Sequence, residues 1–302
     1  MLTKQFIQSV SSIENIKVFE HYDMADATTF KIGGPADLFA EVHTKAALQA
    51  LVLLCNKEQV PFLIVGAGSN LLVSDDGIEG VVCRLAGEFD SCTSSGTKVI
   101  AGAGVSLAKL ARCAQSAGLS GLEFASGIPG TLGGAIYMNA GAYGGEMKDV
   151  VIRTEYMDGA GNIFTVCGED HDFSYRHSMF CGKDYYILSS VMELVPGDSE
   201  AIMETMRELN ARRKEKQPLD KPSAGSTFKR PEGYFAAKLI EDAGLKGCCV
   251  GDACVSEKHS GFVVNNGNAT CADVLGLIEK VQESVKEQFG VSLETEVKII
   301  GR

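Results

Sequence analysis

The apolar positions of the first third of the chain alternate between short runs, which are typical of strands, and helical stripes. Phe39 to Val42 predicts a strand, and Thr44 is placed to cap a helix before Pro61 introduces a second strand at 62–65. The apolar stripe of this predicted helix consists of Ala47, Leu48, Leu51 and Leu54. The order of these elements is β-α-β.

The same pattern predicts a second strand and helix, followed by a region of strands without helices. Val99 to Ala101 is a predicted strand, and Ser106 caps a predicted helix that stops at Gly118. Its apolar face consists of Leu107, Leu110, Ala111 and Ala114. Beyond it, 150–157, 163–166 and 185–194 read as antiparallel strands, the first two joined by a turn.

The last third is dominated by helical patterns. A charged amphipathic helix over 199–216 must end before Pro218, and the following 220–225 cannot continue it, so we place a domain boundary here. A short helix is predicted around 235–243. A long helix over 270–289 has a start signal in Thr270 and an apolar stripe of Val274, Leu277, Ile278, Val281 and Val285.

Composition narrows the class of protein. The 302 residues are 45% hydrophobic and 22% charged, as in packed globular proteins, and the formal net charge of −11 disfavours nucleic acid as a partner. We find no apolar run of membrane-spanning length and no signal-peptide core, so we expect a cytoplasmic protein that needs no membrane. We also expect no obligate protein partner.

Cysteine and histidine spacing gives no metal-binding pattern. The ten cysteines contain no C-x-x-C, and we expect mostly buried, reduced thiols. The histidines lack helical metal spacing and lie outside the two main glycine loops described below. We therefore predict no metal site.

Two glycine-rich segments follow predicted strands and nearly match a dinucleotide-binding fingerprint. In 64–71 and 99–107 the third glycine of the pattern is replaced by Leu71 and Leu107. No acidic residue is clearly placed for a ribose in the second, which disfavours a Rossmann domain. Neither segment carries the Gly-Lys-Ser/Thr of a P-loop.

The most informative glycine-rich stretch is 124–144, from which bulky side chains are almost excluded. Successive peptide N–H groups in such a loop can bind a pyrophosphate without lysine, and small residues let a flat ring system approach the backbone. The alternative is a structural turn between strands.

Three motifs occur in a fixed order: Thr29 to Ala36, Val65 to Leu72, and Gly127 to Gly134. Together they resemble the UDP-N-acetylenolpyruvoylglucosamine reductase family, from about Thr28 to Arg302. The resemblance implies a vanillyl-alcohol-oxidase/PCMH-like FAD-binding fold of two α+β subdomains, at 1–92 and 93–212, and a C-terminal α+β substrate domain at 213–302.

The resemblance also implies noncovalent FAD, reduced by NADPH, and UDP-N-acetylglucosamine enolpyruvate as the substrate. It places the cofactor at Gly66, Ala67, Gly68, Ser69, Asn70, Leu71, Gly127, Ile128, Pro129, Gly130, Thr131, Gly133, Gly134, Ala135, Asn139 and Gly141. The tail resembles the shorter subtype of the family, without an extra tyrosine-bearing substrate loop.

Three catalytic residues follow from the resemblance: Arg176, Ser226 and Glu296. Hydride addition puts negative charge on the substrate carboxylate and α-carbon, which a guanidinium and a carboxylic acid can stabilise. Ser226 would deliver the proton. For Glu296 to act as an acid, burial must raise its pKa. Without the resemblance, each of the three reads as an ordinary surface or turn residue.

Glu294 competes with Glu296, because two residues along a predicted strand point the same way and only the motif selects Glu296. For the substrate we expect contacts from Tyr175, and from Lys229 to the UDP pyrophosphate. Lys229 belongs to the one cluster of basic residues in the chain, for which the alternative interpretation is a solvated helix end. The cluster consists of Arg212, Arg213, Lys214, Lys216, Lys221, Lys229 and Arg230.

Two rival functions remain open on the sequence. An oxygen-using alcohol or hydroxy-acid oxidase of the same FAD superfamily would share the glycine loops but would not need Arg176, Ser226 and Glu296. A noncatalytic nucleotide-binding module would need still less, and it would be isolated colourless.

Overall fold

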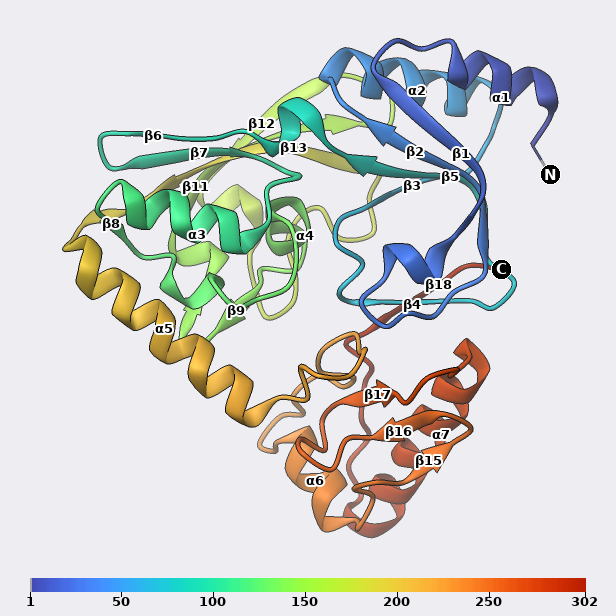
Figure 1. Ribbon diagram of the computed structural model, residues 1–302, viewed down its shortest axis with the longest axis vertical. Helices are drawn as coiled ribbons and strands as arrows, with labels where there is room; N and C mark the ends of the chain where they lie inside the picture. The colour runs from blue at the N-terminus through green and yellow to red at the C-terminus, as the bar shows by residue number, and fades with distance from the viewer. Residues whose placement is uncertain (1) are drawn as a thin grey trace. The chain divides into compact units, whose positions relative to one another are not determined.

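The computed structural model describes residues 2–302 and divides into two compact units, each assembled from several stretches of chain (Figure 1). Unit 1 contains the residues up to Glu20, Leu38–Ala67 and Gly80–Arg212. Unit 2 contains His21–Asp37, Gly68–Glu79 and Arg213–Arg302. The units divide near the end of the predicted helix 199–216, and unit 2 also includes two N-terminal segments.

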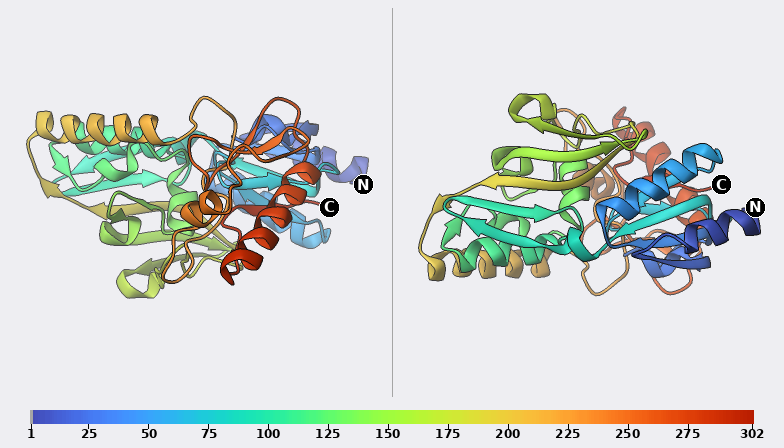
Figure 2. Two further views of the ribbon diagram at one scale, coloured as in Figure 1. Left: turned by 90° about the horizontal axis from the view of Figure 1, so that it is seen from below. Right: turned by 90° about the horizontal axis from the view of Figure 1, so that it is seen from above.

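The larger sheet of unit 1 has five strands in the order β12-β11-β13-β7-β6, all antiparallel. The strands are β6 (Cys92–Ser95), β7 (Lys98–Gly102), β11 (Val151–Asp158), β12 (Ile163–Cys167) and β13 (Tyr185–Glu193). Helices α3 (Leu107–Ser116) and α4 (Leu132–Tyr137) lie on one face of this sheet (Figure 2). An antiparallel sheet of this kind excludes the Rossmann alternative for the 99–107 segment, which contains β7 of this sheet.

A four-stranded sheet has the order β1-β2-β5-β3, in which β3 and β5 are parallel. Its strands are β1 (Ile16–Asp23), β2 (Pro35–Val42), β3 (Phe62–Val65) and β5 (Ile78–Leu85). The predicted β-α-β order is present as β2, α2 (Lys45–Lys57) and β3, but β5 lies between the two strands.

Local capping explains where the helices of unit 1 begin. Ala47 N–H donates to Thr44 Oγ1 at 3.2 Å, and Lys109 N–H donates to Ser106 Oγ at 3.3 Å. These bonds satisfy amides that have no partner inside the helix. The predicted apolar faces are buried in both helices, apart from Leu54, which is partly buried.

The shorter elements of unit 1, and the helix that runs from it into unit 2, are α1 (Lys4–Ser11), β8 (Leu119–Ser120), β9 (Gly141–Ala142), β10 (Gly145–Glu146), β14 (Val195–Pro196) and α5 (Ser199–Lys216). β9 pairs with β10, and β8 pairs with β14.

Unit 2 packs a three-stranded antiparallel sheet, in the order β15-β16-β17, with two helices. Its elements are α6 (Ala236–Asp242), β15 (Cys249–Val250), β16 (Ala253–Val255), β17 (Val263–Asn265) and α7 (Cys271–Phe289). A capping box between Thr270 and Asp273 starts α7, and Gly290 ends it with a φ of 69°. The predicted apolar stripe of α7 is buried in one cluster with Phe30, Ile32 and Leu72.

Unit 2 also holds a parallel pair that no local pattern predicts. β4 (Leu71–Val73) follows the first glycine loop, and its partner β18 (Lys298–Ile300) lies at the end of the chain. Near this pair, Arg302 donates to Asp37 at 2.5 Å. The C-terminal residues are therefore part of the fold of unit 2.

Candidate functional site

The glycine loops of unit 1 meet one another. A Cβ added at Gly66 would lie 2.4 Å from Thr131 Oγ1, so the first loop approaches the 127–134 loop at a distance that only glycine allows. The 102–107 segment joins them, because Gly133 N–H donates to the Ala103 carbonyl at 2.9 Å and Leu107 N–H donates to the Gly130 carbonyl at 3.0 Å. The three segments are thus joined, and the 102–107 segment is largely buried beside the 127–134 loop.

The 127–134 loop leaves backbone open, as a flat cofactor requires. Gly134 is exposed, and a Cβ built there meets only Thr131 Oγ1, at 3.8 Å. Because Gly134 has no side chain, its backbone is open to a ligand. Gly66 differs, because packing against Thr131 leaves no room there for a side chain. The residues present therefore fit a flavin that lies against the 127–134 loop.

The second part of the first glycine loop belongs to unit 2. Gly68 has a φ of 62°, and its added Cβ would lie 2.0 Å from the Ala27 carbonyl oxygen. The Asn70 side chain donates to the Glu296 carbonyl at 3.2 Å, and Lys298 N–H donates to the Asn70 carbonyl at 2.9 Å. The predicted cofactor residue Asn70 is thus bonded directly to the segment that carries the predicted acid.

Unit 2 also brings together the segments of Ser226 and Glu296. Ser226 forms an isolated bridge with Phe262, and Glu296 N–H donates to the carbonyl of Thr227 at 2.8 Å. Both side chains are half-buried. The 226–228 segment therefore lies between the segments that contain Phe262 and Glu296, and it is held there almost entirely by main-chain bonds.

The expectation that Glu294 and Glu296 share a strand is wrong. Residues 293–297 form no strand, because only Thr295 pairs there, in a single bridge with Phe228. Glu294 is exposed and forms an ion pair with Lys229 at 3.1 Å, while Glu296 is half-buried. The backbone irregularity separates the environments of two carboxylates that the sequence could not distinguish.

Arg176 lies in unit 1 at a tight turn. It has a left-handed φ of 56°, and Ser174 and His177 bond each other's backbone across the turn at 3.2 Å. Its guanidinium carbon lies 5.1 Å from the centre of the Tyr175 ring, which is 50% exposed. The predicted pair Tyr175 and Arg176 therefore projects from one turn.

Each unit holds part of the predicted set. Unit 1 contains Arg176, Tyr175 and the 127–141 loop, and unit 2 contains Ser226, Glu296 and Lys229.

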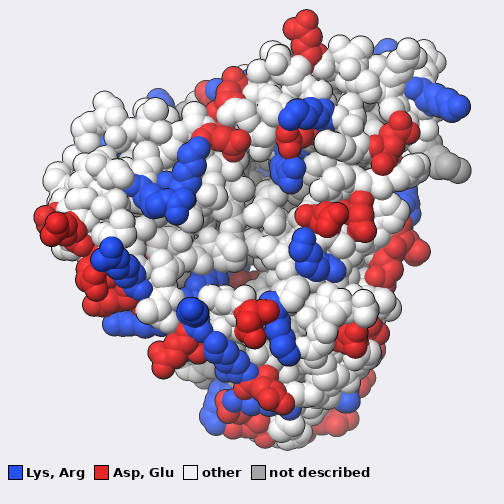
Figure 3. Space-filling model, viewed as in Figure 1, with Lys and Arg blue, Asp and Glu red and all other residues white. Residues whose placement is uncertain are grey.

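The predicted basic concentration includes residues with acidic partners. Besides the pair formed by Lys229, Arg212 lies 3.6 Å from Glu208 on α5. On the face seen in Figure 3, basic and acidic side chains are interspersed. These pairs are exposed, so each contributes little to stability and a ligand phosphate can compete for the cation.

Within residues 2–302 no group of histidine, cysteine and acidic side chains is arranged to hold a metal ion. His171 is fully buried, and its Nε2 lies 2.9 Å from Thr154 Oγ1. Burial lowers the pKa of His171, so the ring is neutral at pH 7. It is a packed core histidine.

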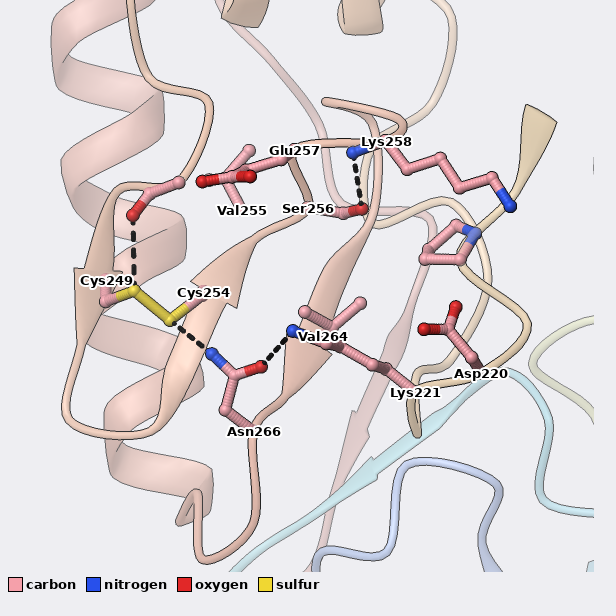
Figure 4. Close-up of a pocket in the computed structure, with 12 residues that line it drawn as sticks. Asp220, Lys221, Cys249, Cys254, Val255, Ser256, Glu257, Lys258, Val264 and Asn266 are labelled. Carbon is pink, nitrogen blue, oxygen red and sulfur yellow. Dashed lines mark hydrogen bonds between the residues drawn. A yellow bond between two sulfur atoms is a disulfide. The ribbon is translucent and has the colours of Figure 1, made fainter. Parts of the chain in front are cut away.

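The cysteines depart in part from the expectation of buried thiols. Cys55, Cys83 and Cys271 are buried and free, but Cys249 and Cys254 face each other across β15 and β16 and form a disulfide (Figure 4). A direct cross-strand position brings two cysteines within bonding reach whatever their sequence motif.

The same hairpin lines a pocket of unit 2 that contains none of the predicted site residues (Figure 4). Its lysines already have partners: Lys221 Nζ donates to Asn266 Oδ1 at 2.7 Å, and Lys258 Nζ donates to the Lys214 carbonyl at 2.7 Å. Asn266 in turn donates to Cys254 Sγ at 2.9 Å. Both lysines of this pocket are therefore already bonded within the protein.

Two regions of the chain match known protein families. Residues 36–166 match the FAD binding domain family, and residues 217–300 match the family described as UDP-N-acetylenolpyruvoylglucosamine reductase, C-terminal domain. In the described part of the chain, no helix has the length and apolarity needed to cross a membrane.

Relatives are similar over nearly the whole chain. A UDP-N-acetylenolpyruvoylglucosamine reductase of Caldanaerobacter subterraneus is 54% identical, covering 94% of each chain, and one of Clostridioides difficile is 49% identical, covering 97% of this chain and 96% of its own. The crystal structure of the reductase from Thermus caldophilus matches with a TM-score of 0.80 at 37% identity, covering 94% of this chain and 98% of that one. The predicted FAD-binding α+β fold is confirmed.

Proposed function

Because the chain belongs to the UDP-N-acetylenolpyruvoylglucosamine reductase family and is an FAD-dependent oxidoreductase, we propose that it reduces UDP-N-acetylglucosamine enolpyruvate to UDP-N-acetylmuramate with NADPH. One observation carries the proposal. Ser226 and Glu296 come from distant sequence positions to adjacent backbone segments, inside the stretch that matches the reductase C-terminal domain. The product would serve peptidoglycan synthesis.

FAD would be held noncovalently by the residues assigned to it above, and when bound it would supply the hydride. Gly66 and Thr131 support this role, since their close approach joins two of the loops concerned. Asn139 would contribute its backbone, because its side chain is occupied inside the protein. Gly134 offers open backbone against which a flat ring can lie.

Three side chains would perform the protein's part of the reduction. As hydride reaches the enolpyruvyl methylene carbon, negative charge develops on the neighbouring carbon and on the carboxylate. Arg176 and Glu296 would stabilise this charge, the first as a fixed cation and the second as a hydrogen-bonding acid. The Ser226 hydroxyl would then transfer its proton to the neighbouring carbon.

Two further residues would bind the substrate. Tyr175 exposes half of its surface beside Arg176 and can pack against the sugar. Lys229 would exchange its surface partner Glu294 for the UDP pyrophosphate, a more strongly charged anion. We expect the protein to act in the cytoplasm, without nucleic acid or an obligate protein partner.

Anaerobic absorbance of the purified flavoprotein tests the proposal. Bleaching by NADPH, followed by recovery on adding UDP-N-acetylglucosamine enolpyruvate, is the expected result. Recovery only on admitting oxygen would indicate the oxidase alternative, and a colourless protein would indicate a nucleotide-binding module. Mass spectrometry of the denatured protein checks that no flavin is covalently attached.

A further inference from the structure

Asn139 follows the glycine loop and is almost completely buried, at 1% exposure, with a left-handed φ of 43°. Its carboxamide nitrogen donates to Glu146 Oε2 at 2.9 Å and to the Ser174 carbonyl at 3.0 Å. Its oxygen accepts from Lys148 N–H at 2.9 Å. The side chain thus ties three segments together, and one of them is the turn that carries Arg176.

The partner of Asn139 is a fixed anion. Glu146 is held by a capping box with Asp149 and lies 2.9 Å from Lys148 Nζ. The hydrogen bond from Lys148, the bond from Asn139 and the positive charge of Arg176 lower the pKa of Glu146 against the opposing effect of burial. Glu146 therefore stays ionised at neutral pH and adds a negative charge to the surroundings of Arg176.

The base of the Arg176 turn is anchored in the protein. Phe173 stacks on His171 with ring centres 4.8 Å apart, and Ser178, which is fully buried, donates to the Tyr137 carbonyl at 2.8 Å. Between them, the bond from Asn139 to Ser174 holds the turn one peptide before Tyr175. That bond is placed to set the direction in which Arg176 leaves the backbone.

We propose that Asn139 is a positioning residue for the reduction, and that its carboxamide fixes the Ser174–His177 turn so that Arg176 meets the developing negative charge. The inference rests on the proposed role of Arg176. Loss of the two donated bonds would leave the Ser174 carbonyl with only the His177 amide as a donor, and Glu146 with only Lys148 and the Asp149 amide. The turn would then have lost its tie to residue 139 and could move.

Asn139→Asp is the sharpest test, because it keeps the size and the acceptor but removes both donors. Both half-reactions are compared per bound FAD, and we expect the reoxidation step to be slowed more than the reduction by NADPH. Reoxidation by the enolpyruvyl substrate should slow by about 10- to 100-fold, the effect of displacing a positioned group by about 1 Å.

Asn162→Asp is a matched control. Asn162 also donates to a carboxylate, Asp158 Oδ2 at 3.2 Å, but it lies at the exposed turn between β11 and β12. The same chemical change there should leave both half-reactions unchanged.

The pH profile separates a lost donor from a damaged fold. In Asn139→Asp the new carboxyl faces Glu146, so its pKa is raised, and protonation on acidification restores one donor. Reoxidation in this variant should therefore recover as pH falls, relative to the parent at the same pH. Asn139→Leu, which cannot gain a proton, should show no such recovery.

Hydrogen exchange supplies a readout that does not depend on turnover. Amides of 174–178 should exchange faster in Asn139→Asp than in the parent or in Asn162→Asp, because the turn has lost its bond at Ser174. In the double variant with Arg176→Lys, the added loss from Asn139→Asp should be less than threefold, since both changes act through one group.

Two outcomes would overturn the inference: unchanged reoxidation in Asn139→Asp, or a loss fully additive with Arg176→Lys. If Asn139→Asp retains no FAD, Glu146→Gln takes its place as the test variant. Unchanged hydrogen exchange at 174–178 together with unchanged reoxidation in Glu146→Gln would count equally against the inference. A normal rate in Arg176→Lys and Arg176→Ala alone would instead refute the proposed catalytic role.

Discussion

The two units hold their candidate residues by different means. In unit 1 the Arg176 turn is tied by buried side chains, above all Asn139. In unit 2 Ser226 and Glu296 are placed mainly by main-chain bonds to neighbouring segments, with one side-chain bond from Asn70 to the Glu296 carbonyl. A turn fixed by side chains can be loosened by one substitution at a distance. A segment fixed mainly by backbone keeps its place more readily when a side chain changes, so substitutions at Ser226 and Glu296 report mainly on chemistry.

The largest effect should come from Ser226→Ala. Its backbone bridge to Phe262 does not involve the hydroxyl, so the fold should persist while the proton donor is lost. We expect flavin reduction by NADPH to be intact and product formation to fall by about 10³-fold. Stopped-flow absorbance measures both steps. Normal turnover of this variant would remove Ser226 from the mechanism.

Glu296→Gln should reduce turnover by about 100-fold, because it removes a group that stabilises the developing charge. Glu294→Gln is the matched control, since it changes the neighbouring exposed carboxylate that pairs with Lys229. We expect its kcat to stay within about twofold of the parent, with a change mainly in KM. Equal losses in the two variants would mean that the motif selects the wrong residue.

In unit 1, Gly66→Ala should weaken both the fold and FAD binding. Its Cβ would lie 2.4 Å from Thr131 Oγ1, and overpacking of this kind costs about 1–3 kcal/mol of unfolding free energy. Gly134→Ala has room for its Cβ and should leave the stability of the apoprotein unchanged while still weakening FAD retention. Denaturant unfolding and flavin titration of both variants distinguish packing from cofactor contact.

The smallest effects compare the helix caps of the two units. Thr270→Ala removes the cap of α7 in unit 2, and Thr44→Ala removes that of α2 in unit 1; each should cost about 1 kcal/mol. Hydrogen exchange should rise mainly in the unit that carries the substitution. Equal acceleration in both units by either change would indicate that they unfold as one.

Elements with local signals could be predicted from the sequence. The helices 45–57, 107–116 and 271–289 begin at their predicted caps and bury their predicted stripes, apart from Leu54, because capping and periodicity act over a few residues. The pairing of β4 with β18 has no such signal, since the two strands meet only after the whole chain has folded. For the same reason the sequence does not indicate that unit 2 is assembled from three separate stretches of chain.

The candidate site was predictable only where its motifs resemble a family. No local pattern distinguishes Ser226 or Glu296 from other residues of the same type, because hydroxyls and carboxylates are common on protein surfaces. Their roles stay predictions. Nothing in the sequence indicates that the side chain of Asn139 turns inward, because its burial depends on contacts with Glu146 and Ser174.

The pairing of the last strand with β4 also bears on how the protein is made. Asn70 and Glu296, which are hydrogen-bonded, lie 226 residues apart in the sequence. During synthesis the N-terminal partner is exposed long before Lys298 to Ile300 emerge from the ribosome. Unit 2, and with it residues 68–71 of the first glycine loop, can therefore be completed only once Lys298 to Ile300 have left the ribosome, so a chain interrupted before them lacks this part of the predicted cofactor site.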